Sequence, residues 1–512
     1  MIYSFSPFGY EGALVNIEID LRKGIPATDI IGLADGSIKE ARERVQWAIK
    51  NSGFEYPPER VLISLSPADI KKEGAGFDLP IALSILETSK KEEMEHSSNT
   101  QVLVMGELDL SGKIRCVKGV YSALQTAVAA GIKYAIIPKN SEKEPDGILC
   151  HRADTLEEAF YALKNLEEDC TDEAYNEMLL NQKNAGSENK IEFTDYCFKD
   201  SFDKIENGLK FAMTVAVAGR HNMAVWGSPG CGKTMALQTL PLIEPNLLPD
   251  EIPSTKRIWS LAGLLKPSEN MKVRPFRIPH QTASIEGICG GGPSCRPGEI
   301  SLAHNGVLFL DEAAEFRSSV LQMLRIPLEN KTICLSRAGR TTVYPANFQL
   351  FMAINPCPCG NYGNKEKFCL CSAKSIEQYW KKFSAPLFDR IEIRYDCNNP
   401  LNKYYMSLEM VQNIISNAWE RQLKRQGKLN NELTPQEITD YIKLTPEAQH
   451  CLDEAIKKYD YSPRTTSNIL KLTRTIADVC SEKETTEIES VWLIEAIKLH
   501  PEIPMLGINE NY

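Results

Sequence analysis

The chain has 512 residues, 43% of them hydrophobic and 25% charged, which is typical of a soluble globular protein with several domains. No apolar run reaches the roughly 18 residues that a membrane helix needs, and the first residues lack a secretion signal, so we expect a cytoplasmic protein without membrane contact. Taken over the whole chain, the formal net charge of −10 argues against a nucleic-acid partner.

Residues 1–165 are expected to form one α/β domain. Apolar and polar residues alternate from 15 to 21, which is typical of a half-buried strand. Further short apolar runs predict strands at 61–65, 102–105 and 134–137. Ser37 and Glu40 have the spacing of a capping box, and apolar residues follow at helical intervals, so a helix is predicted to begin at Ser37.

The next part, residues 166–205, is interpreted as an acidic linker. Residues 140–210 contain 18 Asp or Glu against 8 Lys or Arg, and the stretch 181–189 is polar. The charge of residues 140–210, 8 − 18 = −10, equals that of the whole chain. The remainder is therefore balanced and can hold basic surfaces.

Residues 227–234 read Gly-Ser-Pro-Gly-Cys-Gly-Lys-Thr, which matches the glycine-rich phosphate loop of nucleotide-binding proteins. An apolar strand at 223–226 precedes the loop, and a helix can begin at Thr234. Glycines let backbone N–H groups converge on phosphate oxygens, while Lys233 is expected to reach the β- and γ-phosphates and Thr234 to bind Mg²⁺. The nucleotide-binding candidates are Gly227, Ser228, Pro229, Gly230, Cys231, Gly232, Lys233 and Thr234.

Polar residues follow two further apolar strands. Asp311 and Glu312 follow 307–310, and Asn355 follows 348–354. Open α/β sheets bind ligands at the carboxyl ends of their strands. We therefore expect Asp311 to hold Mg²⁺ through water, Glu312 to polarise the attacking water, and Asn355 to contact the γ-phosphate or that water.

Arg390 stands just before a predicted strand at 391–395. An exposed arginine supplied by a neighbouring subunit can stabilise the charge of a phosphoryl-transfer transition state. The alternative is a local salt bridge between Asp389 and Arg390. Residues 401–512 return to helical patterning and are expected to form a small helical domain.

These elements, in this order, resemble the AAA+ ATPases, and in particular the magnesium-chelatase-like branch known as the YifB or ComM family. The matching stretches are 42–45, 51–54, 67–69, 77–82, 306–312, 355–360 and 475–478. The resemblance implies an α/β protein with a Lon-protease-like (ribosomal S5 domain 2-like) N-terminal domain, a P-loop AAA+ parallel-sheet core at 206–400 and a C-terminal helical lid. It also implies that Asn355 is sensor 1, Arg390 the arginine finger acting in trans, and Arg464 the sensor 2 arginine of the lid.

The Lon-like first domain lacks the groups that proteolysis needs, a Ser nucleophile and a Lys base within reach of each other. The stretch 73–77, which corresponds to the Lon nucleophile region, contains no Ser. The position of the catalytic lysine falls on Tyr121, and Lys118 is expected to point elsewhere. We predict a non-catalytic binding or assembly module.

Four of the 15 cysteines lie close together in the sequence: Cys357, Cys359, Cys369 and Cys371. Two close pairs separated by a short loop can bind one metal ion tetrahedrally, which favours structural Zn²⁺. An iron–sulfur cluster and unligated reduced thiols are the alternatives.

Two regions are basic. Residues 254–300 contain seven basic and three acidic residues, and Arg337 and Arg340 flank the tip of a predicted hairpin. In ring helicases that the chain resembles, a hairpin before sensor 1 reaches into the central pore, where arginines would bind a DNA backbone without reading its sequence. The alternative is that they are solvated loop arginines.

The resemblance implies an ATP-hydrolysing AAA+ ring motor, a homo-hexamer acting on single-stranded or branched DNA, with branch migration or helicase activity in recombination and natural transformation. Its cofactors would be ATP and Mg²⁺, with Zn²⁺ at the cysteines. The alternatives are a magnesium-chelatase-type motor subunit and a protein-remodelling ATPase.

Overall fold

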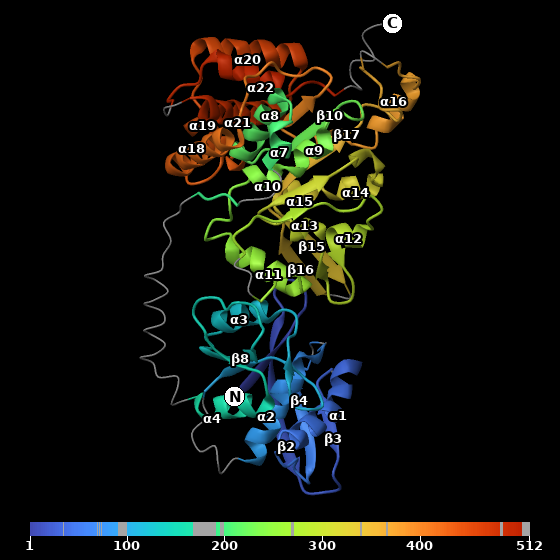
Figure 1. Ribbon diagram of the computed structural model, residues 1–512, viewed down its shortest axis with the longest axis vertical. Helices are drawn as coiled ribbons and strands as arrows, with labels where there is room; N and C mark the ends of the chain where they lie inside the picture. The colour runs from blue at the N-terminus through green and yellow to red at the C-terminus, as the bar shows by residue number, and fades with distance from the viewer. Residues whose placement is uncertain are drawn as a thin grey trace.

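A computed structural model describes most of the chain. The described residues are 1–33, 35–68, 70, 72, 74–90, 100–166, 191–194, 199–267, 271–337, 340–364, 367–481 and 485–503. The polar stretch 181–189 of the predicted linker lies outside them. The molecule is elongated, with the first domain at one end, a sheet-containing core in the middle and the C-terminal helices at the other end (Figure 1). No helix among the described residues is long and apolar enough to span a lipid bilayer.

The first domain is built on a seven-stranded mixed sheet with the order β3-β4-β2-β1-β5-β8-β9. Its strands are β1 Ile2–Ser6, β2 Ala13–Arg22, β3 Thr28–Ile31, β4 Arg60–Ser66, β5 Val102–Val104, β8 Tyr134–Pro138 and β9 Leu149–Ala153. Successive residues of a strand face opposite sides of a sheet. Val102 and Val104 therefore pack with α1 Gly36–Asn51, α2 Asp78–Ser89 and α4 Leu156–Lys164, whereas Leu103 packs with α3 Val120–Ala129. The strands predicted at 15–21, 61–65, 102–105 and 134–137 are thereby confirmed.

One detail of this domain differs from the prediction. Helix α1 is capped by Asp35, whose carboxylate accepts a hydrogen bond from the Ile38 backbone N–H at 3.0 Å. The predicted start at Ser37 is therefore wrong, because Asp35 lies ahead of the helix and its oxygen satisfies one of the free N–H groups of the first turn.

The central core contains a five-stranded sheet with the order β11-β14-β17-β10-β18, in which all neighbours are parallel. Its strands are β10 Met223–Trp226, β11 Phe276–Arg277, β14 Val307–Leu310, β17 Gln349–Ile354 and β18 Ile393–Asp396. Met223 and Val225 face one hydrophobic cluster and Ala224 and Trp226 face another, so both sides of the sheet are covered. The register pairs Trp226 with both Ile354 and Asp396, so these strands end at one edge.

Short helices and hairpins surround this sheet. They are α7 Lys199–Asp203, α8 Asn207–Gly219, α9 Lys233–Gln238, α10 Leu240–Ile243, α11 Ile252–Ala262, α12 Ile285–Cys289, α13 Glu299–Leu302, α14 Ser318–Met323, α15 Arg325–Asn330, β15 Thr332–Arg337, β16 Arg340–Pro345, α16 Ala373–Trp380 and α17 Ala385–Phe388. The predicted hairpin corresponds to β15 and β16, in which Arg337 pairs with Arg340. Residues 338–339 at its tip lie outside the described residues.

The C-terminal helices share their core with the central sheet. They are α18 Leu408–Gln426, α19 Pro435–Tyr441, α20 Pro446–Tyr459, α21 Pro463–Cys480 and α22 Ser490–Lys498. Helix α8 connects the two layers through its carbonyl oxygens, because Trp419 Nε1 donates to Val217 O at 3.2 Å and Gln422 Nε2 donates to Ala218 O at 2.9 Å. A buried ion pair between Arg474 and Asp478 lies within α21.

A short segment of the first domain, residues 7–12, contacts the central core. Tyr10 N donates to Thr342 Oγ1 at 2.9 Å, and Arg257 Nε donates to Tyr10 O at 2.9 Å. Gly9 has a φ of +59°, and a Cβ at this position would lie 2.2 Å from Thr342 Oγ1. Only glycine fits this close approach, so the segment seats directly on β16.

Candidate active site

The phosphate loop connects β10 to α9 at the carboxyl edge of the central sheet. Gly230 and Gly232 have φ values of 87° and 86°, which place both in the left-handed region that favours glycine. Lys233 is only 8% exposed, and its Nζ donates to the carbonyl oxygens of Gly227 at 2.6 Å and Ser228 at 3.1 Å. The ammonium group is therefore held by carbonyls of the loop itself and has to leave them to reach a phosphate.

Thr234 and Asp311 meet at the mouth of this loop. Thr234 Oγ1 donates to Asp311 Oδ1 at 2.8 Å. Mg²⁺–oxygen bonds of about 2.0–2.1 Å place neighbouring ligand oxygens of one ion about 2.9 Å apart. The hydroxyl and the carboxylate thus lie together at the mouth of the loop, and the roles predicted for them, Thr234 on Mg²⁺ and Asp311 holding the ion through water, stay predictions.

A cavity of about 300 Å³ brings the other candidates to the same place. Its lining includes Pro229, Gly230, Gly232, Lys233, Thr234, Asp311, Glu312 and Asn355. Glu312 has a φ of 48°, and its carboxylate accepts a hydrogen bond from the Gln281 amide. The strand ends thus assemble one site with a base, an amide and a phosphate loop around a shared space.

Sequence reasoning missed three residues around this site. Gln281 orients Glu312, Asn398 Oδ1 accepts from Ser228 Oγ at 3.1 Å, and Asn364 Nδ2 donates to the same Oγ at 3.0 Å. Asn398 follows β18 at the edge where Asp311 and Asn355 follow their strands, so the same strand-end rule could have found it. Gln281 and Asn364 lie in loops without a motif.

Arg390 and Arg464 do not line this cavity. Both contact Glu329 of α15: Arg390 Nη2 donates to its carboxylate, and Arg464 Nη1 lies 3.5 Å from Glu329 Oε1. We call these three residues the arginine cluster. Arg390 precedes β18 whereas the phosphate loop follows β10, and the two strands are parallel, so the cluster lies at the opposite edge of the sheet.

The environment of Arg390 differs from the exposed arginine that the sequence led us to expect. Its side chain is 11% exposed, and it also donates to the Pro386 carbonyl. The alternative of a local pair with Asp389 fails too, because the carboxylate that Arg390 contacts is that of Glu329. The Asp389 carbonyl instead accepts from Asn468 Nδ2 at 3.0 Å, which ties this turn to α21.

The four clustered cysteines converge. The sulfur atoms of Cys357, Cys359, Cys369 and Cys371 all lie within 4.8 Å of one another. Cys357 Sγ is 3.3 Å from Cys359 Sγ and 3.6 Å from Cys369 Sγ. Zn–S bonds of about 2.3 Å separate the sulfurs of a tetrahedral site by about 3.8 Å, so these residues can hold a single metal ion.

The cysteine loop rests on the phosphate loop. A Cβ at Gly360, whose φ is +78°, would lie 2.5 Å from Pro229 Cγ, so the two loops touch at van der Waals distance. Asn364 also donates to Ser228. The loop that carries the four cysteines therefore contacts the phosphate loop directly at residues 228 and 229.

The two hairpin arginines have different surroundings. Arg337 is exposed, whereas the Arg340 guanidinium stacks over the Phe8 ring at 5.1 Å from its centroid. Arg340 therefore contacts the first domain, which the sequence did not predict. DNA binding by either residue stays a prediction.

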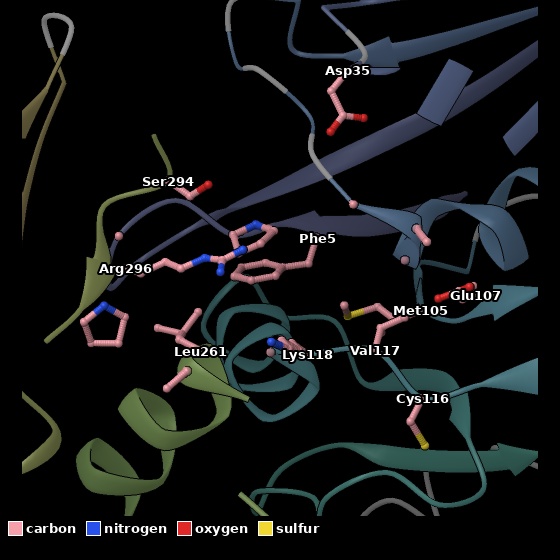
Figure 2. A pocket seen from close by; sticks show the side chains of 18 of the residues that line it. Phe5, Asp35, Met105, Glu107, Cys116, Val117, Lys118, Leu261, Ser294 and Arg296 are labelled. Atoms are coloured by element: carbon pink, nitrogen blue, oxygen red, sulfur yellow. The ribbon is translucent and has the colours of Figure 1, made fainter. Parts of the chain in front are cut away.

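A second cavity, of about 510 Å³, lies between the first domain and the central core (Figure 2). Gly74, Ala75 and Gly76 line it and bring no nucleophile from that stretch. Lys118 lines the same cavity, and its side chain lies against Gly263 at the end of α11. The expectation that it points away from the stretch 73–77 stays a prediction. Tyr121 is 3% exposed and is not among the lining residues.

Comparison with known proteins gives matches over almost the whole chain. Residues 204–404 match the family model described as magnesium chelatase, subunit ChlI, residues 17–141 match subunit ChlI of Mg-chelatase, and residues 406–500 match the ChlI C-terminal model. Competence protein ComM of Haemophilus influenzae is 35% identical over 496 residues, 94% of each chain. YifB of Escherichia coli is 36% identical over 495 residues, 94% of this chain and 93% of its own.

A shorter match is to a Lon protease. Lon protease of Mesomycoplasma hyopneumoniae is 28% identical over 149 residues, which is 27% of this chain and 16% of the protease. The mixed sheet of residues 1–166 and the parallel-sheet core agree with a Lon-like domain followed by an AAA+ module. The chain therefore belongs to the YifB and ComM family of magnesium-chelatase-like AAA+ ATPases.

Proposed function

We propose that the protein is an ATP-hydrolysing motor that acts on DNA as a ring of six identical subunits. The observation that carries the proposal is the division of the active-site groups between two edges of one sheet. Phosphate-binding groups lie at one edge, and the arginine cluster lies at the other. One subunit therefore supplies only part of a phosphoryl-transfer site, and a neighbour in a ring can supply the rest.

ATP supplies the phosphoryl group that is transferred, and Mg²⁺ supplies positive charge that neutralises the phosphate oxygens. For that complex to bind, Lys233 exchanges the Gly227 and Ser228 carbonyls for phosphate oxygens. Thr234 offers its hydroxyl oxygen to the cation, and Asp311, which accepts a hydrogen bond from Thr234, would hold the cation through water. At the same cavity, Glu312, oriented by Gln281, is placed to accept a proton from water, and Asn355 offers an amide to the γ-phosphate side.

The arginine cluster supports a trans arrangement of Arg390 and Arg464. Glu329 offsets part of the positive charge of the two guanidinium groups while no phosphate is near. The phosphate groups of ATP bound to a neighbouring subunit carry more negative charge than one carboxylate. They can compete with Glu329 for the guanidinium N–H donors of Arg390 and Arg464. We therefore propose that Arg390 and Arg464 act as the arginine finger and the sensor 2 arginine that the resemblance implies.

Two observations support DNA as the partner. The net positive charge of residues 254–300 is not one of them, because Lys256 and Arg274 are buried and Arg277 pairs with Glu299. A relative aligned over 94% of this chain at 35% identity is named a competence protein, and Arg337 is exposed at the hairpin. Contacts of this type bind phosphates irrespective of base sequence. We propose branched or single-stranded DNA as the substrate, with branch migration in recombination and natural transformation as the outcome of ATP hydrolysis.

The test is an ATP-dependent branch-migration assay on a synthetic four-way junction with the full-length protein. The wild type should convert the junction only with hydrolysable ATP, and Lys233→Ala should convert none. Lys139→Ala, which removes an exposed lysine from a surface ion pair with Asp154, is the matched control and should behave as the wild type. A wild type that hydrolyses ATP but neither binds nor moves junctions would overturn the DNA proposal.

That last outcome would favour the second candidate, a chelatase-type motor subunit. The family descriptions that match residues 204–404 and 406–500 name magnesium chelatase, and this observation favours the candidate. A chelatase subunit should show no stimulation of ATPase activity by DNA. The same assay therefore separates the two functions.

We further propose that the four cysteines hold structural Zn²⁺. Their close sulfur spacing fits one ion better than a multi-iron cluster, whose irons would each take one sulfur and spread them apart. Elemental analysis of purified protein should find about one zinc per chain. Protein without zinc or iron but with full ATP affinity would leave the four residues as reduced thiols.

A further inference from the structure

Two cysteines outside the metal cluster meet beneath the phosphate loop. Cys231 belongs to the loop, and Cys397 directly follows β18. Both side chains lie against Gly227. A Cβ at Gly227 would lie 2.7 Å from Cys397 Cβ and 3.1 Å from Cys231 Sγ, so the three residues converge on one point.

Both cysteines are held in this arrangement by the surrounding backbone. Cys397 N donates to Trp226 O at 2.8 Å, which fixes Cys397 against the residue that precedes the loop. Cys231 N donates to Ser228 O at 3.3 Å within the loop. Disulfide bonds need Cβ atoms about 3.8 Å apart and suffer when the backbone has to move. The loop already places both residues beside Gly227, Cys397 with its Cβ and Cys231 with its Sγ.

Cys231 is also the more reactive of the two thiols. It is exposed to solvent, and Lys233 Nζ lies 3.7 Å from its Sγ. The hydrogen bond from Cys397, together with the charge of Lys233, lowers the pKa of Cys231 to about 6. A thiolate with an ammonium group beside it reacts faster with oxidants than an ordinary thiol.

We propose that Cys231 and Cys397 form an oxidation site, in which a hydroperoxide closes a disulfide across the phosphate loop. The Cys231 thiolate attacks the peroxide oxygen, the O–O bond breaks, and Cys231 becomes a sulfenic acid while the leaving oxygen takes a proton. Cys397 sulfur then attacks Cys231 sulfur, the S–S bond forms, and the S–OH oxygen leaves as water. Two thiols lose two electrons and the peroxide gains them.

The disulfide would hold the loop in its nucleotide-free form. Lys233 lies on the Gly227 and Ser228 carbonyls in the arrangement that places Cys231 against Cys397. A covalent bond at Cys231 keeps the loop from rearranging around phosphates, so ATP binding weakens until the bond is reduced. This consequence rests on the proposed ATP-binding function, whereas the disulfide itself does not.

Peptide mapping tests the bond directly. Full-length protein, reduced and then treated with hydrogen peroxide, is digested with trypsin without reductant. Cys231 and Cys397 fall in the tryptic peptides 221–233 and 395–403, which contain one cysteine each. The two peptides should appear linked, and pre-bound Mg·ATP should slow the linkage. Wild-type protein in which Cys231 is oxidised to a sulfinic acid while Cys397 stays free would overturn the proposal.

ATP binding tests the consequence. Oxidised wild type should bind a fluorescent ATP analogue at least tenfold more weakly than reduced wild type, and dithiothreitol should restore the affinity. Cys397→Ser removes the resolving thiol, so excess hydrogen peroxide should carry Cys231 on to a sulfinic acid, and dithiothreitol should not restore the lost affinity. Cys334→Ser, which removes a lone exposed thiol of β15, should match the wild type.

The outcomes separate the two claims. Linked peptides with unchanged ATP affinity would overturn the effect on the loop. Reduced protein that binds no ATP would instead contradict the proposed function, while the peptide map would still decide whether the disulfide forms.

Discussion

The two edges of the central sheet differ in how their charged groups are held. At the carboxyl edge, Lys233, Thr234 and Asp311 contact one another or the loop backbone, and an open cavity lies between them. At the other edge, Arg390 and Arg464 share one carboxylate, Glu329, and do not line that cavity. The groups of the first edge surround an open space, whereas the two guanidinium groups of the second edge are held by a carboxylate of their own subunit.

The largest expected effect comes from separating the two edges by mutation. Lys233→Ala should abolish ATP binding, and Arg390→Ala should keep ATP binding but lower hydrolysis about 10³-fold or more. An equal mixture of the two variants should regain activity, because about one interface in four combines two intact edges when subunits mix at random. Steady-state ATPase assays on the mixture measure this recovery.

The control is a mixture of Lys233→Ala with Asp311→Ala, two changes at the same edge. This mixture should stay inactive, because neither variant has an intact carboxyl edge and no interface can therefore be complete. Recovery in the control, or none in the first mixture, would contradict the assignment of the two edges to different subunits.

Glu312→Gln sharpens the comparison within the carboxyl edge. The amide keeps the size of the side chain but cannot accept a proton, so hydrolysis should fall about 10²–10⁴-fold while ATP affinity stays near that of the wild type. Equilibrium binding and single-turnover hydrolysis separate the two quantities. A parallel loss of ATP affinity would mean that Glu312 binds the nucleotide instead of activating water.

Glu329→Ala tests the arginine edge. Glu329 positions both guanidinium groups, so its loss should lower kcat about 3–10-fold with little change in ATP affinity, a smaller effect than removing Arg390 itself. Glu329→Gln keeps an oxygen acceptor and should recover part of the rate. Glu377→Gln, at a surface ion pair with Lys381, serves as the control and should not change kcat. Equal rates in Glu329→Ala and the wild type would remove the positioning role.

The smallest effect is expected at the hairpin. Because Arg337 is exposed, Arg337→Ala should weaken DNA binding by a few-fold. The slope of the logarithm of the binding constant against the logarithm of the salt concentration should fall by about one, the contribution of one phosphate contact. Arg340→Ala should affect DNA less and stability by about 0.5–1 kcal/mol, because its guanidinium lies over Phe8. Fluorescence anisotropy at several salt concentrations distinguishes the two. Identical DNA affinities of wild type and Arg337→Ala would contradict the hairpin proposal.

Much of the carboxyl edge could be predicted because its signals are local. An apolar run followed by Asp311-Glu312, or by Asn355, predicts the end of a strand. Parallel strands bring such ends together at one edge of the sheet. The arginine cluster could be predicted only in part. Glu329 lies 61 residues from Arg390 and 135 from Arg464, and an acidic residue on a short helix has no pattern that names its partners.

The contact of Arg340 with Phe8 escaped prediction for the same reason. It joins segments from two domains, and neither residue has a neighbour in sequence that signals the other. The start of α1 was wrong because two acceptors competed for one helix end, and Asp35 precedes Ser37. Local chemistry therefore predicted the strands and the phosphate loop, whereas the contacts that orient side chains depended on the tertiary fold.

The segment 7–12 has a mechanical consequence. Tyr10 is bonded on one side to Arg257 of α11 and on the other to Thr342 of β16, and Phe8 lies under Arg340. A hairpin that moved alone would lose the Thr342 and Arg340 contacts, at about 1 kcal/mol each. The hairpin and the first domain are therefore mechanically coupled. Any movement of the hairpin would carry the first domain with it.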